Sequence, residues 1–332
     1  MPESLAPVII VTVAAVGLGV VNGFNDAANA VAASIGSHSL SPRNALIIAA
    51  FCNLAGAATG LEVAKTIGKG ILVPEAISYS TVIAGLAAVI IWGSVATRLG
   101  LPVSITHSFV AGLAGAGMAV AGTKAIQWGV MQQVLSSVVA APMLGFVGGF
   151  ALMVILLWTF RRSAPAKIRA IFIRLQIFTT ALLAYSHGKN DGQMPIGVIT
   201  MALVIYTGQA ELWDNIPWWV IVLSALAISS GTFIGSWRVI RTLGLRITAL
   251  QPIHGFAADA SAATVIEVAS HLGIPVSTTH CATSAIIGIG ATRRLSAVKW
   301  GVTRNIALAW IWTFPACGIL GWIIAWLLKI AF

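Results

Sequence analysis

The sequence predicts an all-α integral membrane protein with two inverted-topology repeats, re-entrant broken-helix hairpins and about ten to twelve membrane segments. The 332 residues are 58% hydrophobic and 8% charged, whereas about a quarter of the residues in soluble domains are charged. One decapeptide occurs twice, as LGLPVSITHS at Leu99–Ser108 and as LGIPVSTTHC at Leu272–Cys281, and an Asn-Asp pair precedes each copy. An apolar chain that repeats its polar residues in corresponding places predicts a pseudo-symmetric transporter with its site between the halves.

The chain divides at a short basic segment. We expect the first inverted repeat at residues 1–160, a basic cytoplasmic connector at residues 161–170 and the second inverted repeat at residues 171–332. In each half a spanning helix reaches the Asn-Asp motif and two or three apolar spans follow. A Pro-Val-Ser-x-Thr-His element then interrupts the next span, and a final long helix closes the half.

Individual apolar runs have the length that a spanning helix needs. Leu5–Val21 lacks a basic flank and a cleavage-like site, which predicts a first spanning helix and not a signal peptide. Pro142–Phe160, Trp218–Trp237 and Ala307–Leu328 are each long enough to cross the hydrocarbon layer. Trp237–Leu250 carries arginines among apolar residues, which predicts an amphipathic helix lying on the membrane surface.

The net charge of +10 comes from basic residues at the ends of apolar spans. This distribution argues against nucleic-acid binding, which needs a basic face. The densest cluster lies between Arg161 and Arg174, so the positive-inside rule predicts that it is cytoplasmic and that both termini are external. Three widely spaced cysteines indicate neither a disulfide framework nor a structural metal site.

Each decapeptide combines a helix break with hydroxyl groups. Pro102 and Pro275 lack a backbone donor and disfavour helix in the preceding residue, which predicts a break followed by a short helix. Hydroxyls and free backbone N–H groups near the positive end of that helix suit an oxyanion. Broken helices at membrane depth also predict a cavity at the midplane. The predicted substrate-binding residues are Asp26, Ser104, Ile105, Thr106, Asn190, Asp191, Ser277, Thr278 and Thr279.

Two carboxylates occupy matching places in the two halves, Asp26 and Asp191. An aspartate inside a membrane costs about 2.5–3.5 kcal/mol even on lenient insertion scales. Oxygen-rich clusters suit a hard monovalent cation or a proton, and carboxylates repel an anion unless such a cation enters with it. The sequence therefore predicts coupled symport. The predicted coupling residues are Asn25, Asp26, Asn29, Asn190 and Asp191, with a sodium ion expected at Asn25, Asp26, Asn190 and Asp191.

Simpler interpretations stay open for single residues. Membrane serines and threonines commonly bond to carbonyls of their own helix, although repetition beside proline argues against that for the decapeptides. His107 and His280 are predicted to fix the hairpins from behind the site, without binding the ligand. The other histidines, His187 among them, carry no individual argument from the sequence.

Four further charged residues have both a functional and a structural interpretation. Glu62 and Lys65 lie at helical spacing, which a simple ion pair would explain. Lys189 either neutralises Asp191, attracts anions or extends to the membrane interface. Glu267 faces either a cavity or a neighbouring helix that bears an acid.

The paired motifs GFNDAANA and SHGKNDGQ, with PVSITH and PVSTTH, resemble the PiT family of inorganic phosphate transporters over nearly the whole chain. The resemblance implies an inverted-repeat fold, often dimeric, that carries phosphate with sodium or protons. The NDGQ form is similar to the bacterial Pit branch, for which proton coupling and uptake of metal–phosphate complexes are described. Asp259 falls where many relatives have glutamate, so the resemblance adds it to the coupling residues.

The expected function is a secondary active symporter, not an enzyme, in the cell (inner) membrane. It would import phosphate, free or complexed with a metal, with sodium or a proton as coupling ion and without a cofactor. Its expected partners are phosphate, the coupling cation, the lipid bilayer and a second copy of the chain, and no nucleic acid. A sulfate or other oxyanion permease, a cation exchanger and an intramembrane hydrolase or metalloenzyme are the alternatives. No HExxH or GxSxG motif supports the last of these.

Overall fold

The structure, a computed structural model, describes residues 5–331. Within these residues the chain is helical and forms no strand, which confirms the all-α class. The first half contains α1 (Ala6–Gly36), α2 (Pro42–Ala57), α3 (Glu62–Gly70), η1 (Pro74–Ala76), α4 (Tyr79–Leu99), α5 (Ile105–Ala121), η2 (Gly122–Ala125) and α6 (Trp128–Thr159). The second half contains α7 (Pro165–Asp191), α8 (Gln193–Thr207), η3 (Ala210–Trp213), α9 (Trp218–Ile234), α10 (Trp237–Arg241), η4 (Thr242–Arg246), α11 (Pro252–His271), α12 (Thr278–Arg293), η5 (Leu295–Ala297) and α13 (Trp300–Ala331).

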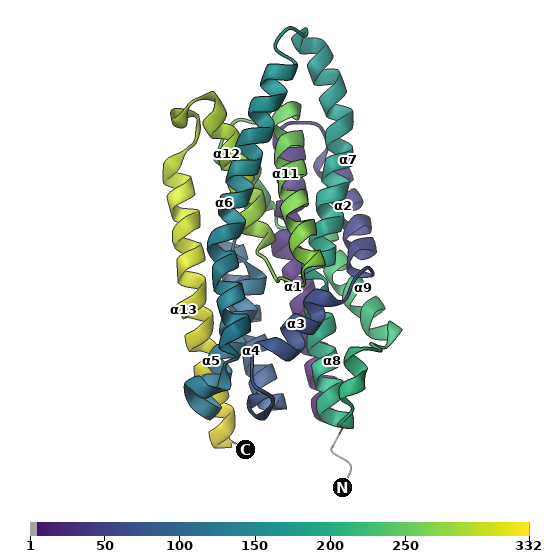
Figure 1. Ribbon diagram of the computed structural model, residues 1–332, viewed down its shortest axis with the longest axis vertical. Helices are drawn as coiled ribbons and strands as arrows, with labels where there is room; N and C mark the ends of the chain where they lie inside the picture. The colour runs from purple at the N-terminus through teal and green to yellow at the C-terminus, as the bar shows by residue number, and fades with distance from the viewer. Residues whose placement is uncertain (1–4, 332) are drawn as a thin grey trace.

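The two halves run in opposite directions along the long axis of the molecule. The start of α1 and the end of α13 lie at the lower end in Figure 1, and the turn from α6 to α7 lies at the upper end. This turn is shorter than the connector expected at residues 161–170, because α7 already begins at Pro165. Two inverted halves that each cross the membrane an odd number of times would give the chain this path, and the inverted repeat itself stays a prediction.

The two ends of α6 provide a test of orientation. We expect a cysteine at Ser163, at the upper end, to resist a membrane-impermeant maleimide in intact cells, because the neighbouring arginines favour the cytoplasm. A cysteine at Thr123, in the exposed segment before α6, should be labelled from outside. Both variants are made without Cys52, Cys281 and Cys317, which are free thiols. Labelling at Ser163 but not at Thr123 would reverse the orientation.

Within residues 5–331, six helices are long and apolar enough to cross a membrane, and the count rises to eight if two bent pairs are included. The pairs are α2 with α3 and α9 with α10, bent by 73° and 62°. This count is lower than the expected ten to twelve segments. The remaining helices are shorter or more polar, and α11 and α12 are largely buried by protein.

The two decapeptides form the predicted breaks between helices. α4 ends before Gly100, whose φ is 71°, and α5 starts at Ile105 after five non-helical residues. In the second half Gly273, with φ of 66°, follows α11. Glycine suits both turns because other residues rarely adopt a positive φ. α4 and α5 occupy the lower half of Figure 1 and α11 and α12 the upper half, so the hairpins enter from opposite ends and their tips lie near the middle.

The last helix of each half packs against the hairpin of the other half. α5 lies along α13, and α12 lies along α6. Glycines permit the close approach: a Cβ at Gly115 would lie 2.0 Å from the carbonyl oxygen of Gly318, and one at Gly288 would lie 2.3 Å from that of Phe146. The glycine-rich sequences after the two breaks therefore act as predicted, by bringing helix backbones together.

Gly115→Ala should destabilise the protein because its methyl group would press on the backbone of α13. Overpacking of this kind costs about 1–3 kcal/mol. We expect a lower unfolding temperature in detergent. Gly129→Ala is the matched control, since a Cβ there meets nothing within 4 Å, and it should be neutral or stabilising. Equal unfolding temperatures for both variants would contradict the packing of α5 on α13.

The prediction of a surface helix at Trp237–Leu250 was wrong. The segment is the short helix α10 followed by the π-helical turn η4, and Val239, Ile240 and Leu243 are buried. Gly244 packs directly on α1, where its Cβ would lie 2.4 Å from the carbonyl oxygen of Ala32. Much of the apolar face is thus covered by protein, while Trp237 and Leu245 are exposed.

Candidate functional site

Both Asn-Asp motifs lie inside the protein, close to the hairpin tips. Asp26 lies within the continuous helix α1, whereas Asp191 is the last residue of α7, where Gly192 joins it to α8. Each aspartate is 1% exposed. Two carboxylates buried at one place in a membrane protein are costly unless they are paired or bind a ligand, so this place is the candidate site.

The hairpin threonines reach the aspartates in a crossed pattern. Thr106 of the first half donates to Asp191 Oδ1 of the second half (3.3 Å), and Thr279 of the second half donates to Asp26 Oδ1 of the first (3.0 Å). These threonines occupy the same place in the two decapeptides. Thr278 adds a bond to Asp191 Oδ2 (3.0 Å) that the first half lacks, because Ile105 is its counterpart. The site therefore contains groups from both halves.

The asparagine of each motif links its aspartate to the hairpin of its own half. The Asn25 amide lies 2.5 Å from the Thr97 hydroxyl, and in the orientation that satisfies both of its groups it donates to Asp26 Oδ1 (2.9 Å) and to the carbonyl of Val103 (3.3 Å). In the second half, Asn190 makes the corresponding contacts with Ser270 (3.0 Å), Asp191 Oδ1 (3.0 Å) and the carbonyl of Val276 (3.1 Å).

Asn29 adds a further oxygen ligand to the site. Its Nδ2 donates to Thr279 Oγ1 (2.9 Å) and lies 3.4 Å from Thr278 Oγ1. Its Oδ1 is buried and has no hydrogen-bond partner among the described residues. A free amide oxygen and two carboxylates are ligands of the kind that a hard cation prefers. Of the residues predicted to hold sodium, Asp26 and Asp191 have this chemistry, whereas Asn25 and Asn190 direct their amide oxygens to Thr97 and Ser270.

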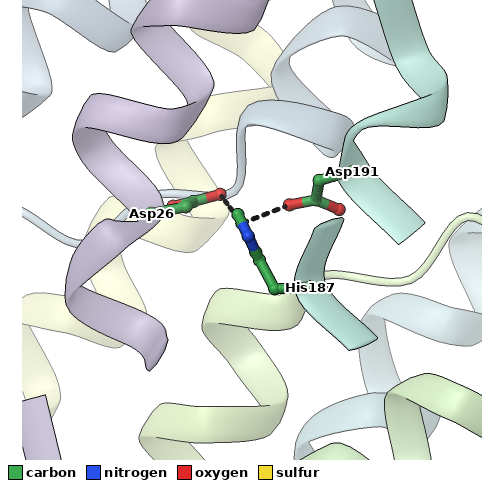
Figure 2. A group of neighbouring side chains, drawn as sticks. All are labelled: Asp26, His187 and Asp191. Carbon is green, nitrogen blue, oxygen red and sulfur yellow. Dashed lines mark ion pairs between the residues drawn. The ribbon is translucent and has the colours of Figure 1, made fainter. Parts of the chain in front are cut away.

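His187 was not predicted, yet it lies between the two aspartates (Figure 2). Its Nε2 is 3.3 Å from Asp191 Oδ2 and 4.0 Å from Asp26 Oδ2. The three side chains offer ligand atoms that all lie within 4.8 Å of one another. On the other side of the ring, Nδ1 lies 2.8 Å from Asn53 Oδ1, and Asn53 Nδ2 donates to Thr232 (2.7 Å). Such a partner on the second nitrogen orients an imidazole toward a ligand.

One sequence signal could have identified His187. It lies four residues before Asp191, so both side chains project from one face of α7. The repeat concealed this signal, because the corresponding residue of the first half is Asn22. Asn22 is also buried, and neither of its amide atoms has a hydrogen-bond partner among the described residues.

The hairpin serines act first as helix caps. Ser104 accepts a hydrogen bond from the backbone N–H of His107, and Ser277 accepts one from that of His280, both at 3.1 Å. Each cap fixes the first turn of α5 or α12 and leaves the other N–H groups of that turn without a partner in the helix. Ile105, the first residue of α5, contributes one of these N–H groups.

His107 and His280 lie close together at the hairpins. Their ring centroids are 5.0 Å apart, and the His280 ring lies 3.9 Å from that of Trp310 in α13. The Trp310 indole donates to the carbonyl of Pro102 (3.0 Å). The two histidines thus contact each other and α13, and a role in supporting the hairpins stays a prediction.

Two other predicted features make their contacts outside the crossed site. Asp259 of α11 accepts a hydrogen bond from Thr180 (2.9 Å), a residue about 16 Å from Asp191 along α7 at 1.5 Å per residue. The expected pairing of Glu62 with Lys65 was wrong, since the partner of Lys65 is Asp214 at 3.5 Å. Neither feature is part of the crossed site.

The chain matches known phosphate transporters in sequence. The model of the "Phosphate transporter family" matches residues 22–321. The chain is 38% identical over 326 residues to the "Probable low-affinity inorganic phosphate transporter" of Bacillus subtilis (strain 168), a match that covers 98% of each chain. It is 39% identical over 323 residues to the protein of the same description from Rhizobium meliloti (strain 1021), covering 96% of each.

A solved structure has the same fold. The match to "The sodium-dependent phosphate transporter" has a TM-score of 0.91 at 27% identity and covers 98% of this chain and 100% of that one. Because the family and these relatives are transporters, the alternative of an intramembrane hydrolase is set aside. The family and the apolar helices identify a multi-pass protein of the cell membrane. The chain belongs to the phosphate transporter family, whose model matches residues 22–321.

Proposed function

We propose that this protein is a secondary active symporter that imports inorganic phosphate with sodium or protons by alternating access. The crossed threonines carry the proposal. Each of Asp26 and Asp191 is bonded to a hairpin threonine of the other half. A movement of one half against the other must therefore change the hydrogen bonds of both carboxylates at once. This would couple cation binding to anion binding.

The anion would bind at the paired starts of α5 and α12. Both helices direct their first N–H groups toward the same region, where the dipole favours negative charge. Thr106, Thr278 and Thr279 supply hydroxyls there, and Ile105 supplies a backbone N–H. Ser104 and Ser277 would shape this cradle by capping the two helices.

The cation would bind at the carboxylates and at the asparagines of the two motifs. Without it, two buried negative charges would repel phosphate. Asn25 and Asn190 would hold the aspartates in place, and Asn29 Oδ1 would be a further ligand. Asp259 would bind the cation at a separate point of its path, away from Asp26 and Asp191. Its partner Thr180 lies far from Asp191 along α7.

One observation favours a second form of the substrate. The Asp26, His187 and Asp191 group includes an imidazole nitrogen. Nitrogen ligands suit divalent transition metals better than sodium. Uptake of phosphate as a complex with a divalent metal is therefore the second candidate for the same site.

Alternating access is supported by the closed state of the site. Asp26, Asp191, Thr106, Thr278 and Thr279 are each at most 2% exposed, so a ligand reaches them only after a conformational change. We propose inverted repeats at residues 1–160 and 171–332, joined by residues 161–170, as the moving units. Each would carry its hairpin against the last helix of the other, α13 or α6.

Uptake by purified protein in liposomes tests the proposal. Radioactive phosphate is offered with an inward sodium gradient, with an inward proton gradient, with a divalent metal and with no gradient. We expect accumulation above equilibrium with one of the two cation gradients, and competition by excess unlabelled phosphate. Accumulation of sulfate but not phosphate would show that the substrate is another oxyanion. Cation flux without any oxyanion would show that the protein is a cation exchanger.

A further inference from the structure

A second polar cluster lies at the tip of the α11–α12 hairpin. Lys189 Nζ of α7 contacts Glu267 Oε1 of α11, and His271 Nε2 lies 3.3 Å from the same oxygen. The two nitrogens are 3.2 Å apart. A lysine and a histidine thus converge on one carboxylate oxygen. The other oxygen, Glu267 Oε2, is buried and has no hydrogen-bond partner among the described residues.

The cluster is joined to the phosphate site by adjacent backbone. Lys189 directly precedes Asn190, and His271 directly follows Ser270, the hydroxyl partner of Asn190. An anion held at Lys189 and His271 would therefore lie one residue from the Asn-Asp motif on α7 and one residue from its hairpin contact on α11.

Exposure indicates that water reaches this tip. The Lys189 side chain is 10% exposed, that of Glu267 is 30% exposed and that of His271 is 70% exposed. The hairpin enters from the upper end and its tip lies near the middle of the long axis (Figure 1). Charged groups at that depth face water and not lipid. Since α11 and α12 occupy the upper half, we infer that the aqueous approach to the tip is from the lower end, which carries the termini.

The other hairpin lacks this cluster. When the two Asn-Asp motifs and the two decapeptides are aligned, Lys189, Glu267 and His271 correspond to Phe24, Ser94 and Arg98. At the first hairpin the guanidinium of Arg238 contacts the backbone carbonyl of Arg98 instead. A group needed only to build a hairpin should occur in both copies. The cluster therefore serves one end of the transport path.

We propose that Lys189, Glu267 and His271 form an entry subsite for phosphate at the end that carries the termini. The Lys189 ammonium and the His271 N–H bind oxygens of the oxyanion. The Glu267 carboxylate holds these donors until phosphate displaces it, and the anion then passes to the hairpin threonines. This inference rests on the proposed function, because it assigns phosphate as the ligand.

Three variants separate an anion subsite from a structural ion pair: Lys189→Gln, Glu267→Gln and the double variant. We expect Lys189→Gln to raise the KM for phosphate entering from the lower end by about ten-fold, the effect of one lost charge-assisted hydrogen bond. kcat and the KM from the opposite face should be unchanged. Glu267→Gln should lower the KM, because it removes the competing carboxylate. The double variant should keep a high KM.

A structural ion pair gives the opposite pattern. Glu267→Gln would then impair the protein as Lys189→Gln does, and the double variant would restore the wild-type KM. Lys65→Gln, which breaks the Lys65–Asp214 pair, is the matched control and should leave KM unchanged. The decisive binding measurement is titration of inorganic phosphate into each variant in detergent. If Lys189→Gln fails to fold, the lowered KM and tighter phosphate binding of Glu267→Gln still test the proposal.

The two proposals fail in distinguishable ways. If the wild-type protein does not transport phosphate, the proposed function is wrong. If it transports phosphate and the KM of Lys189→Gln and of Glu267→Gln stays within two-fold of wild type, the entry subsite is wrong and the proposed function stands.

Discussion

Asp26→Asn and Asp191→Asn are each expected to abolish accumulation of phosphate against a gradient while leaving the protein folded. The asparagine keeps the size of the side chain and an oxygen that can accept from Thr279 or Thr106, so the hairpins stay in place. What is lost is the negative charge that attracts the coupling cation. Because allosteric coupling commonly changes affinity by about 5- to 150-fold, we expect the cation to lose most of its effect on phosphate affinity.

The measurement for these variants combines concentrative uptake in liposomes with phosphate affinity in detergent across sodium and pH series. Asp214→Asn is the control, because it removes an exposed carboxylate whose partner is Lys65, and it should transport normally. If Asp26→Asn and Asp191→Asn still concentrate phosphate with the wild-type cation dependence, the coupling role passes to Asp259, Glu267 or Glu62.

Thr106→Val and Thr279→Val should weaken phosphate binding in both halves of the site. Valine has nearly the shape of threonine, so the change removes a hydroxyl next to Asp191 or Asp26 with little effect on packing. A hydrogen bond to a charged group is worth about 1.5–3 kcal/mol, which corresponds to roughly ten- to a hundred-fold in affinity. Thr279→Val should have the larger effect, because the same hydroxyl also accepts from Asn29.

Thr283→Val is the matched control for this pair. Thr283 lies one turn further along α12, and its hydroxyl has no hydrogen-bond partner among the described residues. Phosphate affinity is measured by titration at saturating sodium and at several pH values. Equal affinities for Thr106→Val, Thr279→Val and Thr283→Val would show that the crossed hydroxyls do not contribute to binding.

Local chemistry made the hairpins and the paired motifs predictable. Pro102 and Pro275 disfavour helix in the residue before them wherever they occur, so the breaks follow from the sequence alone. The cost of a carboxylate in a membrane likewise identified Asp26 and Asp191 before any contact was known. Because both features occur twice in the same order, the sequence then indicated that the helix breaks and the aspartates belong to one functional site.

The crossed pattern could not be predicted in the same way. Thr106 and Asp191 are 85 residues apart, and Thr279 and Asp26 are 253 apart. Which threonine reaches which aspartate depends on how α5 lies against α13 and α12 against α6. Close helix packing through glycines fixes that arrangement, and a sequence pattern does not specify it.

His187 and the segment at Trp237–Leu250 show two other features that could not be predicted from the sequence. The repeat directed attention to residues present twice, and His187 is present once, with Asn22 in its place in the first half. An amphipathic pattern shows that one face is apolar but not what covers it. In Trp237–Leu250 the cover is α1, where Gly244 lies against Ala32.

The central claim is that phosphate and a cation bind as one coupled unit between the two halves. Its most direct test is the phosphate dissociation constant of the purified wild-type protein, measured by titration at increasing sodium and at several pH values, together with cation affinity at increasing phosphate. Symport at this site predicts that one cation tightens phosphate binding and that phosphate tightens binding of that cation by the same factor. Phosphate affinity that is independent of both sodium and pH would contradict the account.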